Sequence, residues 1–540
     1  MRRCKKVFLV AWLVSVFLLG VGASMGFSAT CSKADLDALG LTDEAFGQPV
    51  TFTSAAIVPA SGTVPQYCNI QGSMWPTIGF KIQLPINDEA NPNAWNKRFQ
   101  MTGCGGAAGS FQSQAVLNSY LTQGFAVATT DMGHTGTTFD FSFANPAKSE
   151  NSDQKLKDYV YRAVHEMAKL TKSLIQAYYG KAPDYSYYNG SSCGGGRGMR
   201  NFQNYPEDFD GWVVGMPSFY KYGTSPGMLW SSQAAELGAG RIPTAKLPLL
   251  ANAVMAKCDG VDGLVDGMID DPLRCAFDPD RDLPKCRDDV DATTCFTSAQ
   301  RVSIKKIYDG IRTSMLIMPE LGAMYGSELM VPSGTTAASG WRGMLVGDVM
   351  SEPNPGALYK NVNLNFVVNV NKDLRLMGED WDWTKPFDYD YDVLYAPRRD
   401  TAADSTDIGR VKSLGKKVIH FHGWADALVR PLPSVNYYEK LLQTFGDAET
   451  KSFYKLYMVP NYGHGGGFGC SNANWDLALR NWVENGIEPG AIIGSRAAVP
   501  LQSIPARTRP LCPYPEVARH NGTGSIEDAA NFMCVPPVSY

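Results

Sequence analysis

Short apolar segments alternate with helical stretches from Phe80 to about Pro217, and the alternation resumes near Val411. The apolar segments that read as strands include residues 98–102, 185–188, 417–421 and 453–459. Strands that alternate with helical patterns are typical of βαβ units, which build a parallel sheet with helices packed against it. The pattern therefore predicts an α/β fold with a mainly parallel sheet flanked by helices.

Residues 218–395 interrupt this alternation with many turn signals. Ligands of open α/β folds bind outside the carboxyl ends of the strands, so we expect this insertion to be a lid over that edge. We predict a lid domain at residues 218–395, inserted into a domain built from residues 30–217 and 396–540. Aromatic residues alternate with aspartate near its end, a pattern that equally fits a half-exposed strand: Trp381, Trp383, Phe387, Tyr389 and Tyr391.

The N-terminus has a pattern of its own. Four basic residues precede an apolar run at residues 7–21, and small residues follow that run. This order is typical of a secretory signal peptide, which we place at residues 1–29, with cleavage after Ala23 or Ala29. The run is short for a membrane-spanning helix, which needs about 18 or more apolar residues. We therefore expect a secreted or periplasmic protein with no stable membrane association after cleavage.

A Gly-x-Ser-x-Gly pattern, made by Gly190, Ser192 and Gly194, lies between an aromatic strand and a segment that can form a helix. This is the pattern of the nucleophile elbow of α/β-hydrolases. The turn is so tight that the residues two before and two after the serine must lack a Cβ. Cys193 is a rival nucleophile, because a thiolate is more reactive than a hydroxyl. Ser191 stands two residues before Cys193, however, so the glycines fit Ser192 alone, and Ser192 is the predicted nucleophile.

The partners of Ser192 are predicted from chain order. In this class of hydrolase the acid and then the base follow the serine, each on a loop after a later strand. Asp426 follows the strand at residues 417–421, and His464 follows the strand at residues 453–459. We therefore predict the triad of Ser192, Asp426 and His464. The other histidines considered for the role are interpreted as structural: His134, His165, His420 and His422.

An ester carbonyl that is attacked by serine develops an oxyanion, which needs preorganised N–H donors. One donor is predicted at the backbone of Cys193, the residue after the nucleophile. The second is predicted in the glycine-rich loop that follows the strand at residues 98–102, at Gly105 or Gly106, because glycine lets a backbone amide approach a ligand closely. The residues themselves do not decide between these two.

Several further motifs resemble the tannase and feruloyl esterase family, and the resemblance runs from about Cys31 to the C-terminus. It implies an α/β-hydrolase fold with a large inserted lid domain and ester hydrolysis through an acyl-serine. The motifs that carry it are residues 161–166, 187–190, 205–211 and 422–426, and Gly463 and His464 with the glycines that follow.

Cysteine usage fits an exported protein. The resemblance implies four disulfides: Cys31–Cys68, Cys258–Cys275, Cys286–Cys295 and Cys512–Cys534. The family usually also joins a cysteine directly before the nucleophile to one directly after the histidine, but this chain has Ser191 and Gly465 there. A substitute bridge between Cys193 and Cys470, or one that involves Cys104, is an open alternative. Because free cysteines are usually buried and unreactive, our preferred expectation is that Cys104, Cys193 and Cys470 are packing residues.

A group of aspartates separated by glycines lies between Cys258 and Cys275. Hard oxygen ligands at this density favour calcium. The family carries a structural calcium here, and the resemblance implies that it holds the lid and takes no part in the chemistry. The implied ligands are the side chains of Asp259, Asp262 and Asp266 and the backbone carbonyls of Leu264 and Met268.

The formal net charge is −4, with no basic cluster beyond the N-terminus, so nucleic acid is not an expected partner. The predicted function is a secreted serine esterase that hydrolyses small aromatic, phenolic esters, of the feruloyl esterase or tannase type. One alternative is a hydrolase of hydroxyalkyl aromatic esters. Another is a catalytically inactive, calcium-stabilised binding protein on the same scaffold. The complete order of serine, aspartate and histidine argues against the inactive scaffold, whereas the missing family bridge argues for it.

Overall fold

A computed structural model describes residues 30–313, 317–328, 340–346, 401–498 and 504–537. The predicted signal peptide and the aromatic residues near the end of the predicted lid lie outside the described residues. None of the described helices combines the length and the apolar character that crossing a membrane requires.

The centre of the fold is a nine-stranded sheet. Strands β1, β2, β3 and β5 pair antiparallel, and all further neighbours from β5 to β11 pair parallel. The predicted α/β fold with a mainly parallel sheet is thus confirmed. In spatial order the strands are β1 (Thr51–Val58), β2 (Tyr67–Met74), β3 (Ile78–Pro85), β5 (Ala126–Thr130), β4 (Arg98–Thr102), β6 (Tyr185–Ser191), β7 (Gly211–Gly215), β10 (Lys417–Gly423) and β11 (Tyr454–Val459).

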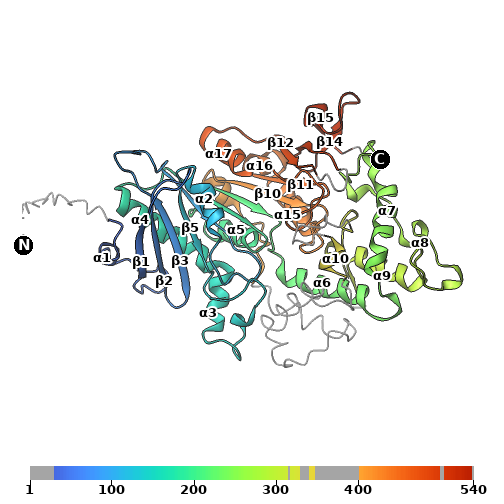
Figure 1. Ribbon diagram of the computed structural model, residues 1–540, viewed down its shortest axis with the longest axis horizontal. Coiled ribbons are helices and arrows are strands. Elements are labelled where there is room, and N and C mark those ends of the chain that lie inside the picture. The colour runs from blue at the N-terminus through green and yellow to red at the C-terminus, as the bar shows by residue number, and fades with distance from the viewer. Residues whose placement is uncertain (1–29, 314–316, 329–339, 347–400, 499–503, 538–540) are drawn as a thin grey trace, which may run out of the picture.

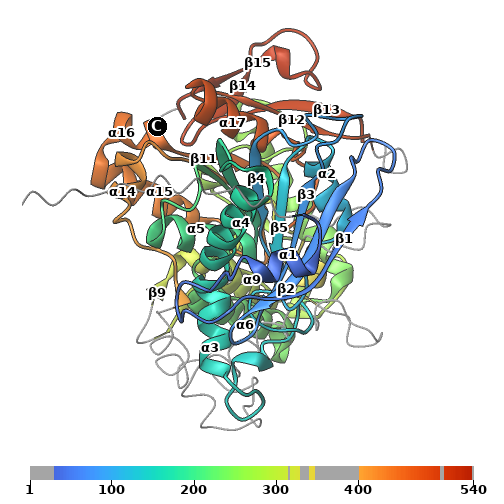
Figure 2. The same cartoon turned by 90° about the vertical axis from the view of Figure 1, so that its left-hand side faces the viewer.

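Helices cover both faces of the sheet because its central strands are apolar on both sides. In β7, Trp212 and Val214 join the core on one face, whereas Val213 joins the core on the other, since successive side chains of a strand point to opposite faces. Figure 2 shows α4 and α5 on one side of the sheet and α2 on the other. The first face packs against α4 (Ala163–Tyr179), α5 (Cys193–Asn204) and α15 (Leu432–Phe445), and the second against α2 (Gln114–Leu121) and α17 (Trp475–Asn485).

The smaller elements connect or flank these layers. The helices are α1 (Lys33–Ala38), α3 (Ser152–Lys157), the π-helical turn η2 (Asp158–Arg162), α14 (Gly409–Ser413) and α16 (Asp447–Phe453). Two antiparallel strand pairs near the C-terminus lie above the sheet in Figure 1: β12 (Ile492–Arg496) with β13 (Arg507–Leu511), and β14 (Val517–His520) with β15 (Phe532–Val535).

The segment that begins at α6 has an apolar core of its own, which includes Leu250, Ile304 and Trp341. Ala427, directly after Asp426, also joins this core. Figure 1 shows α7, α8 and α9 on the side of the molecule beyond β10 and β11. The division into two domains stays a prediction. The elements are α6 (Lys221–Glu236), α7 (Leu247–Cys258), α8 (Pro279–Asp282), α9 (Ser298–Asp309), α10 (Trp341–Met344), β8 (Ile311–Arg312) and β9 (Ile317–Met318).

The structure contains the four disulfides that the family resemblance implied. A fifth bridge joins Cys104 to Cys193, whose Cα atoms are 5.4 Å apart. The expectation that these two cysteines are unpaired packing residues is therefore wrong. They meet because β4 and β6 are parallel neighbours in the sheet, so the loops that follow the two strands lie side by side. Cys470 is free and buried.

Candidate active site

Ser192 stands between β6 and α5 with φ 57° and ψ −116°, a backbone conformation that residues with side chains rarely adopt. Its N–H donates to the carbonyl of Gly215 at 2.9 Å, and its carbonyl accepts from the N–H of Ser218 at 2.8 Å. A Cβ on Gly190 would lie 2.6 Å from the carbonyl carbon of Gly194. The tight turn therefore requires glycine at these positions, and the end of β7 holds it in place.

Ser192, His464 and Asp426 lie in one hydrogen-bonded row. The Nε2 atom of His464 is 2.9 Å from Ser192 Oγ, and its Nδ1 is 2.7 Å from Asp426 Oδ2. The three residues meet because they follow β6, β10 and β11, whose carboxyl ends share one edge of the parallel part of the sheet. With Nδ1–H donating to the carboxylate, Nε2 is free to accept the serine proton.

Asp426 is fully buried, and its carboxylate accepts hydrogen bonds from protein donors. Oδ1 accepts from the N–H groups of Leu428 at 2.9 Å and Val429 at 2.8 Å. Burial on its own would raise the pKa of Asp426, but the imidazoles of His464 and His422 outweigh it and hold the pKa below its ordinary value. Asp426 is therefore ionised at neutral pH, as an orienting acid must be.

The remaining histidines near the sheet have other partners. His422 Nε2 donates to the carbonyl of Val429 at 2.9 Å and lies 3.4 Å from Asp426 Oδ2. It therefore stabilises the segment that carries Asp426. His420 Nδ1 lies 2.8 Å from the hydroxyl of Tyr454. The other two histidines that were interpreted as structural also have partners other than Ser192. His134 stacks on Phe143, and His165 pairs with Asp208.

The glycine-rich loop after β4 lies against the elbow. The disulfide from Cys104 to Cys193 joins them, and the N–H of Gly194 donates to the carbonyl of Cys104 at 2.9 Å. Within the described part of the chain, the backbone N–H groups of Cys193, Gly105 and Gly106 make no hydrogen bond to protein. These N–H groups remain available to a ligand. The expectation that the chain lacks a disulfide beside the catalytic residues is not supported, because the structure has a bridge that involves Cys104, an alternative that the sequence left open. The bonded sulfur removes Cys193 as a rival nucleophile.

Gly106 is the more constrained of the two glycines that the sequence left open. Its φ is +53°, and a Cβ there would lie 2.1 Å from the carbonyl oxygen of Thr138. The hydroxyl of Tyr159 donates to the Gly106 carbonyl at 2.9 Å. A Cβ on Gly105 would meet nothing within 4 Å. The backbone at Gly106 is therefore held in one orientation by its surroundings.

The acidic loop, residues 259–270, contains all five predicted calcium ligands. The Asp259 carboxylate accepts from the N–H groups of Asp266 and Gly267, and the Asp262 carboxylate accepts from Leu264 N–H. Asp266 forms ion pairs with Arg507, at 3.0 Å, and with Arg509. Among the described residues, no three side chains of His, Cys, Asp or Glu form a group that could hold a metal ion. The calcium site stays a prediction.

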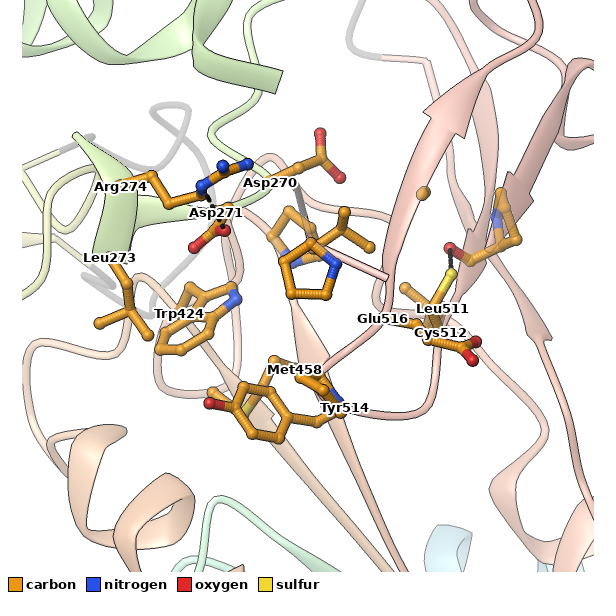
Figure 3. Close-up of a pocket in the computed structure, with 16 residues that line it drawn as sticks. Asp270, Asp271, Leu273, Arg274, Trp424, Met458, Leu511, Cys512, Tyr514 and Glu516 are labelled. Carbon is orange, nitrogen blue, oxygen red and sulfur yellow. Dashed lines mark hydrogen bonds and ion pairs between the residues drawn. The ribbon is translucent and has the colours of Figure 1, made fainter. Parts of the chain in front are cut away.

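A cavity of about 170 Å³ lies between the end of the acidic loop, the end of β11 and the segment at residues 510–518. Figure 3 shows Met458 and Tyr514 on one side of the cavity and Asp271 and Arg274 on the other, with Trp424 between the two pairs. Neither Ser192 nor His464 lines it. The cavity is therefore separate from the triad.

Comparison with known proteins gives consistent results. A profile of the family described as "Tannase and feruloyl esterase" matches residues 62–535. An uncharacterized esterase of Xanthomonas campestris pv. campestris is 32% identical, with 94% of this chain and 92% of that protein covered. Mono(2-hydroxyethyl) terephthalate hydrolase of Piscinibacter sakaiensis is 28% identical, with 90% and 87% covered. The solved structure of feruloyl esterase B from Aspergillus oryzae has a TM-score of 0.74 at 24% identity, with 90% of this chain and 97% of that chain covered, and the predicted α/β-hydrolase fold is confirmed.

Proposed function

This chain belongs to the tannase and feruloyl esterase family, and on that basis we propose that it hydrolyses esters of aromatic, phenolic acids at Ser192. The protein is a carboxylic ester hydrolase, so the proposal concerns its substrate and the roles of its residues. The observation that carries the roles of the residues is the row of contacts from Asp426 through His464 to Ser192, at 2.7 and 2.9 Å.

The proposed reaction has two acyl-transfer steps. Ser192 Oγ attacks the ester carbonyl carbon while His464 Nε2 takes the serine proton, and Asp426 stabilises the imidazolium. The oxyanion accepts hydrogen bonds from the N–H of Cys193 and from the N–H of Gly105 or Gly106. His464 then protonates the leaving alcohol oxygen. In the second step His464 deprotonates a water molecule, which attacks the acyl-serine. His464 then returns the proton to Ser192 Oγ as the bond to the acyl group breaks and the acid is released.

The aromatic acyl group is supported by the family and by the feruloyl esterase whose fold this chain shares. A second candidate, a hydroxyalkyl ester of an aromatic acid, is favoured by the mono(2-hydroxyethyl) terephthalate hydrolase among the relatives. Both candidates use the same triad, and they differ in the leaving alcohol and in the ring that the site accepts. A direct comparison of substrates therefore separates them.

The test compares methyl ferulate, methyl gallate and mono(2-hydroxyethyl) terephthalate as substrates of the wild type and of Ser192→Ala. We expect the wild type to have its highest kcat/KM with methyl ferulate or methyl gallate, the two methyl esters of phenolic acids. The alanine variant should lose nearly all activity, because only Ser192 carries the nucleophile. A higher kcat/KM for the terephthalate ester would instead support the second candidate.

The same experiment addresses the inactive-scaffold alternative. A fluorophosphonate reacts with an activated serine whatever the acyl specificity of the enzyme. Labelling of the wild type but not of Ser192→Ala supports an active esterase. No turnover together with no labelling would contradict the proposal and favour a binding protein.

We also propose that the acidic loop binds a structural calcium ion. Its oxygen donors are of the type that calcium prefers. Asp270, the last residue of the loop, is buried, and its Oδ1 has no hydrogen-bond partner among the described residues. The proposed ligands are Asp259, Asp262 and Asp266 through their side chains and Leu264 and Met268 through their carbonyls. Thermal unfolding should occur at a higher temperature with calcium than with a chelator, and an unchanged Tm would contradict the site.

Export to a secreted or periplasmic location is a further part of the proposal. It is supported by the five disulfides of the described residues, because such bonds persist in oxidising compartments. Expression of the full chain should yield a mature protein that starts after Ala23 or Ala29. Recovery of the uncleaved chain from the cytosol alone would contradict it.

A further inference from the structure

Asn461 links two loops that lie far apart in the sequence. It is the second residue of the histidine loop, residues 460–469, and its side chain is directed into the acidic loop. Its Nδ2 donates to the carbonyl of Gly267 at 2.9 Å, and its Oδ1 accepts from the N–H of Ile269 at 3.0 Å. Asn461 is only 3% exposed. Its hydrogen bond with Ile269 is buried, and its hydrogen bond with Gly267 is partly buried.

The backbone of Asn461 also sets the shape of the histidine loop. Its φ is +48°, and asparagine is among the few residues other than glycine that adopt this left-handed conformation. Its carbonyl accepts from the N–H of Gly469 at 2.9 Å, which closes the loop around His464. The next residue, Tyr462, accepts from the N–H of Ala425 at 3.0 Å. The loop is thereby tied to the segment that carries Asp426.

The acidic loop is a firm support for this contact. The carboxylate of Asp266, directly before Gly267, forms ion pairs with Arg507 and Arg509 of β13. These three side chains are almost fully buried. The loop also begins beside the disulfide of Cys258. A displacement of residues 267–269 would therefore disturb several buried contacts.

Close packing does not hold the whole boundary between the two loops. The cavity in Figure 3 lies between residues 270–274 and the start of the histidine loop, where Met458 and Pro460 form part of its wall. Asn461 follows the lining residue Pro460 in the chain, and its partner Ile269 precedes the lining residue Asp270. At this part of the boundary, the hydrogen bonds of Asn461 fix the histidine loop relative to the acidic loop, because the cavity leaves fewer packing contacts there.

We propose that Asn461 is a positioning residue, which fixes the histidine loop to the acidic loop and thereby keeps His464 Nε2 at hydrogen-bond distance from Ser192 Oγ. This inference rests on the proposed function, because it assumes that His464 is the base. Misplacement of a catalytic group by about 1 Å can cost about 100-fold in rate. A purely structural Asn461 would instead affect stability and leave kcat unchanged.

The experiment uses Asn461→Gly, because glycine keeps the left-handed backbone and removes both side-chain hydrogen bonds. We expect kcat to fall by about 10- to 100-fold while KM changes by less than about twofold, since the Asn461 side chain is buried against the backbone of Gly267 and Ile269 and is not presented at the surface. Asn461→Asp, which retains the acceptor for the Ile269 N–H but not the donor to Gly267, should have an intermediate kcat. It also keeps the test decisive if the glycine variant does not fold.

Asn96→Gly is the matched control. Asn96 likewise makes two hydrogen bonds with backbone groups, accepting from the N–H of Arg98 at 2.9 Å and donating to the carbonyl of Gln123 at 2.7 Å. It precedes β4, at the opposite end of that strand from the glycine-rich loop. We expect it to leave kcat unchanged. An equal loss of kcat in both variants, or an unchanged kcat in Asn461→Gly, would overturn the proposal.

Fluorophosphonate labelling and hydrogen exchange separate this inference from the proposed function. The rate of labelling at Ser192 should fall in Asn461→Gly by the same factor as kcat, and amide exchange at residues 461–469 should become faster. If wild type and Asn461→Gly are labelled at the same rate, the inference is overturned and the esterase assignment stays intact. A wild type that is neither active nor labelled would overturn the proposed function, whereas unchanged exchange would count against the role of Asn461 independently.

Discussion

The disulfide between Cys104 and Cys193 joins the residue before Gly105 to the residue after Ser192. A hydrogen bond from Gly194 N–H to the Cys104 carbonyl runs beside it. Together they hold the two segments that we propose to donate to the oxyanion. Donors that are fixed before the reaction lower the barrier because they need no reorganisation in the transition state.

Replacement of both cysteines by alanine should therefore reduce kcat by about 10- to 100-fold, because the two donors lose their fixed separation. The backbone N–H of residue 193 is retained, so some activity should remain. Steady-state kinetics measures this effect. The double variant Cys286→Ala, Cys295→Ala is the control, since it removes a disulfide from the α8–α9 region and should change Tm but not kcat. Equal kcat values in the two double variants would contradict the role of the elbow bridge.

The two candidate oxyanion glycines should respond differently to alanine. In Gly106→Ala, the new Cβ would collide with the carbonyl of Thr138 in a backbone conformation that disfavours side chains. We expect a lower Tm and a loss of kcat. Gly105→Ala adds a methyl group to open space and should leave Tm nearly unchanged. A similar Tm for both variants would show that the glycine loop relaxes more easily than its contacts indicate.

Asp426→Asn should reduce kcat by about 10⁴-fold. The amide no longer stabilises the imidazolium and favours the wrong tautomer of His464. Because the pKa of Asp426 is depressed in the folded protein, its charge adds stability at pH values above its unfolded pKa, about 3.9. That contribution disappears as the pH falls through the lower folded pKa. A kcat within about tenfold of wild type would mean that another acid serves His464.

Glu328 predicts a pH dependence of opposite sign. It is fully buried beside Tyr308, and burial raises its pKa to about 7. Since the folded pKa exceeds the unfolded value, ionisation costs stability progressively as the pH rises from about 4.3 to 7. The cost is about 4 kcal/mol above pH 7. Chemical denaturation across this range should show a decline in the wild type that Glu328→Gln lacks. Parallel curves for the two proteins would contradict the assignment.

Much of the site was predictable because it depends on local rules. The turn at Ser192 needs glycine on both sides, and the order of nucleophile, acid and base follows the order of the strands. The boundaries were less accurate. β6 extends to Ser191 because its pairing with β7 continues as far as Gly215, which an isolated aromatic segment does not reveal.

Contacts between distant segments were not predictable in the same way. The pairing of Cys104 with Cys193 depends on β4 and β6 being neighbours, and several sheet orders are compatible with the same strands. Nothing in the local pattern around Asn461 indicates that its side chain forms hydrogen bonds with the backbone groups of Gly267 and Ile269. The aspartates of the acidic loop were evident, but their arginine partners come from β13, far along the chain.

Trapping of the acyl-enzyme tests the role of Ser192 itself. The protein would be mixed with an activated feruloyl ester, quenched in acid during turnover and digested for mass spectrometry. We predict a feruloyl group on the peptide that contains Ser192, and no such adduct in Ser192→Ala. Hydrolysis of the ester without an adduct on Ser192, or with the adduct on another residue, would contradict the mechanism.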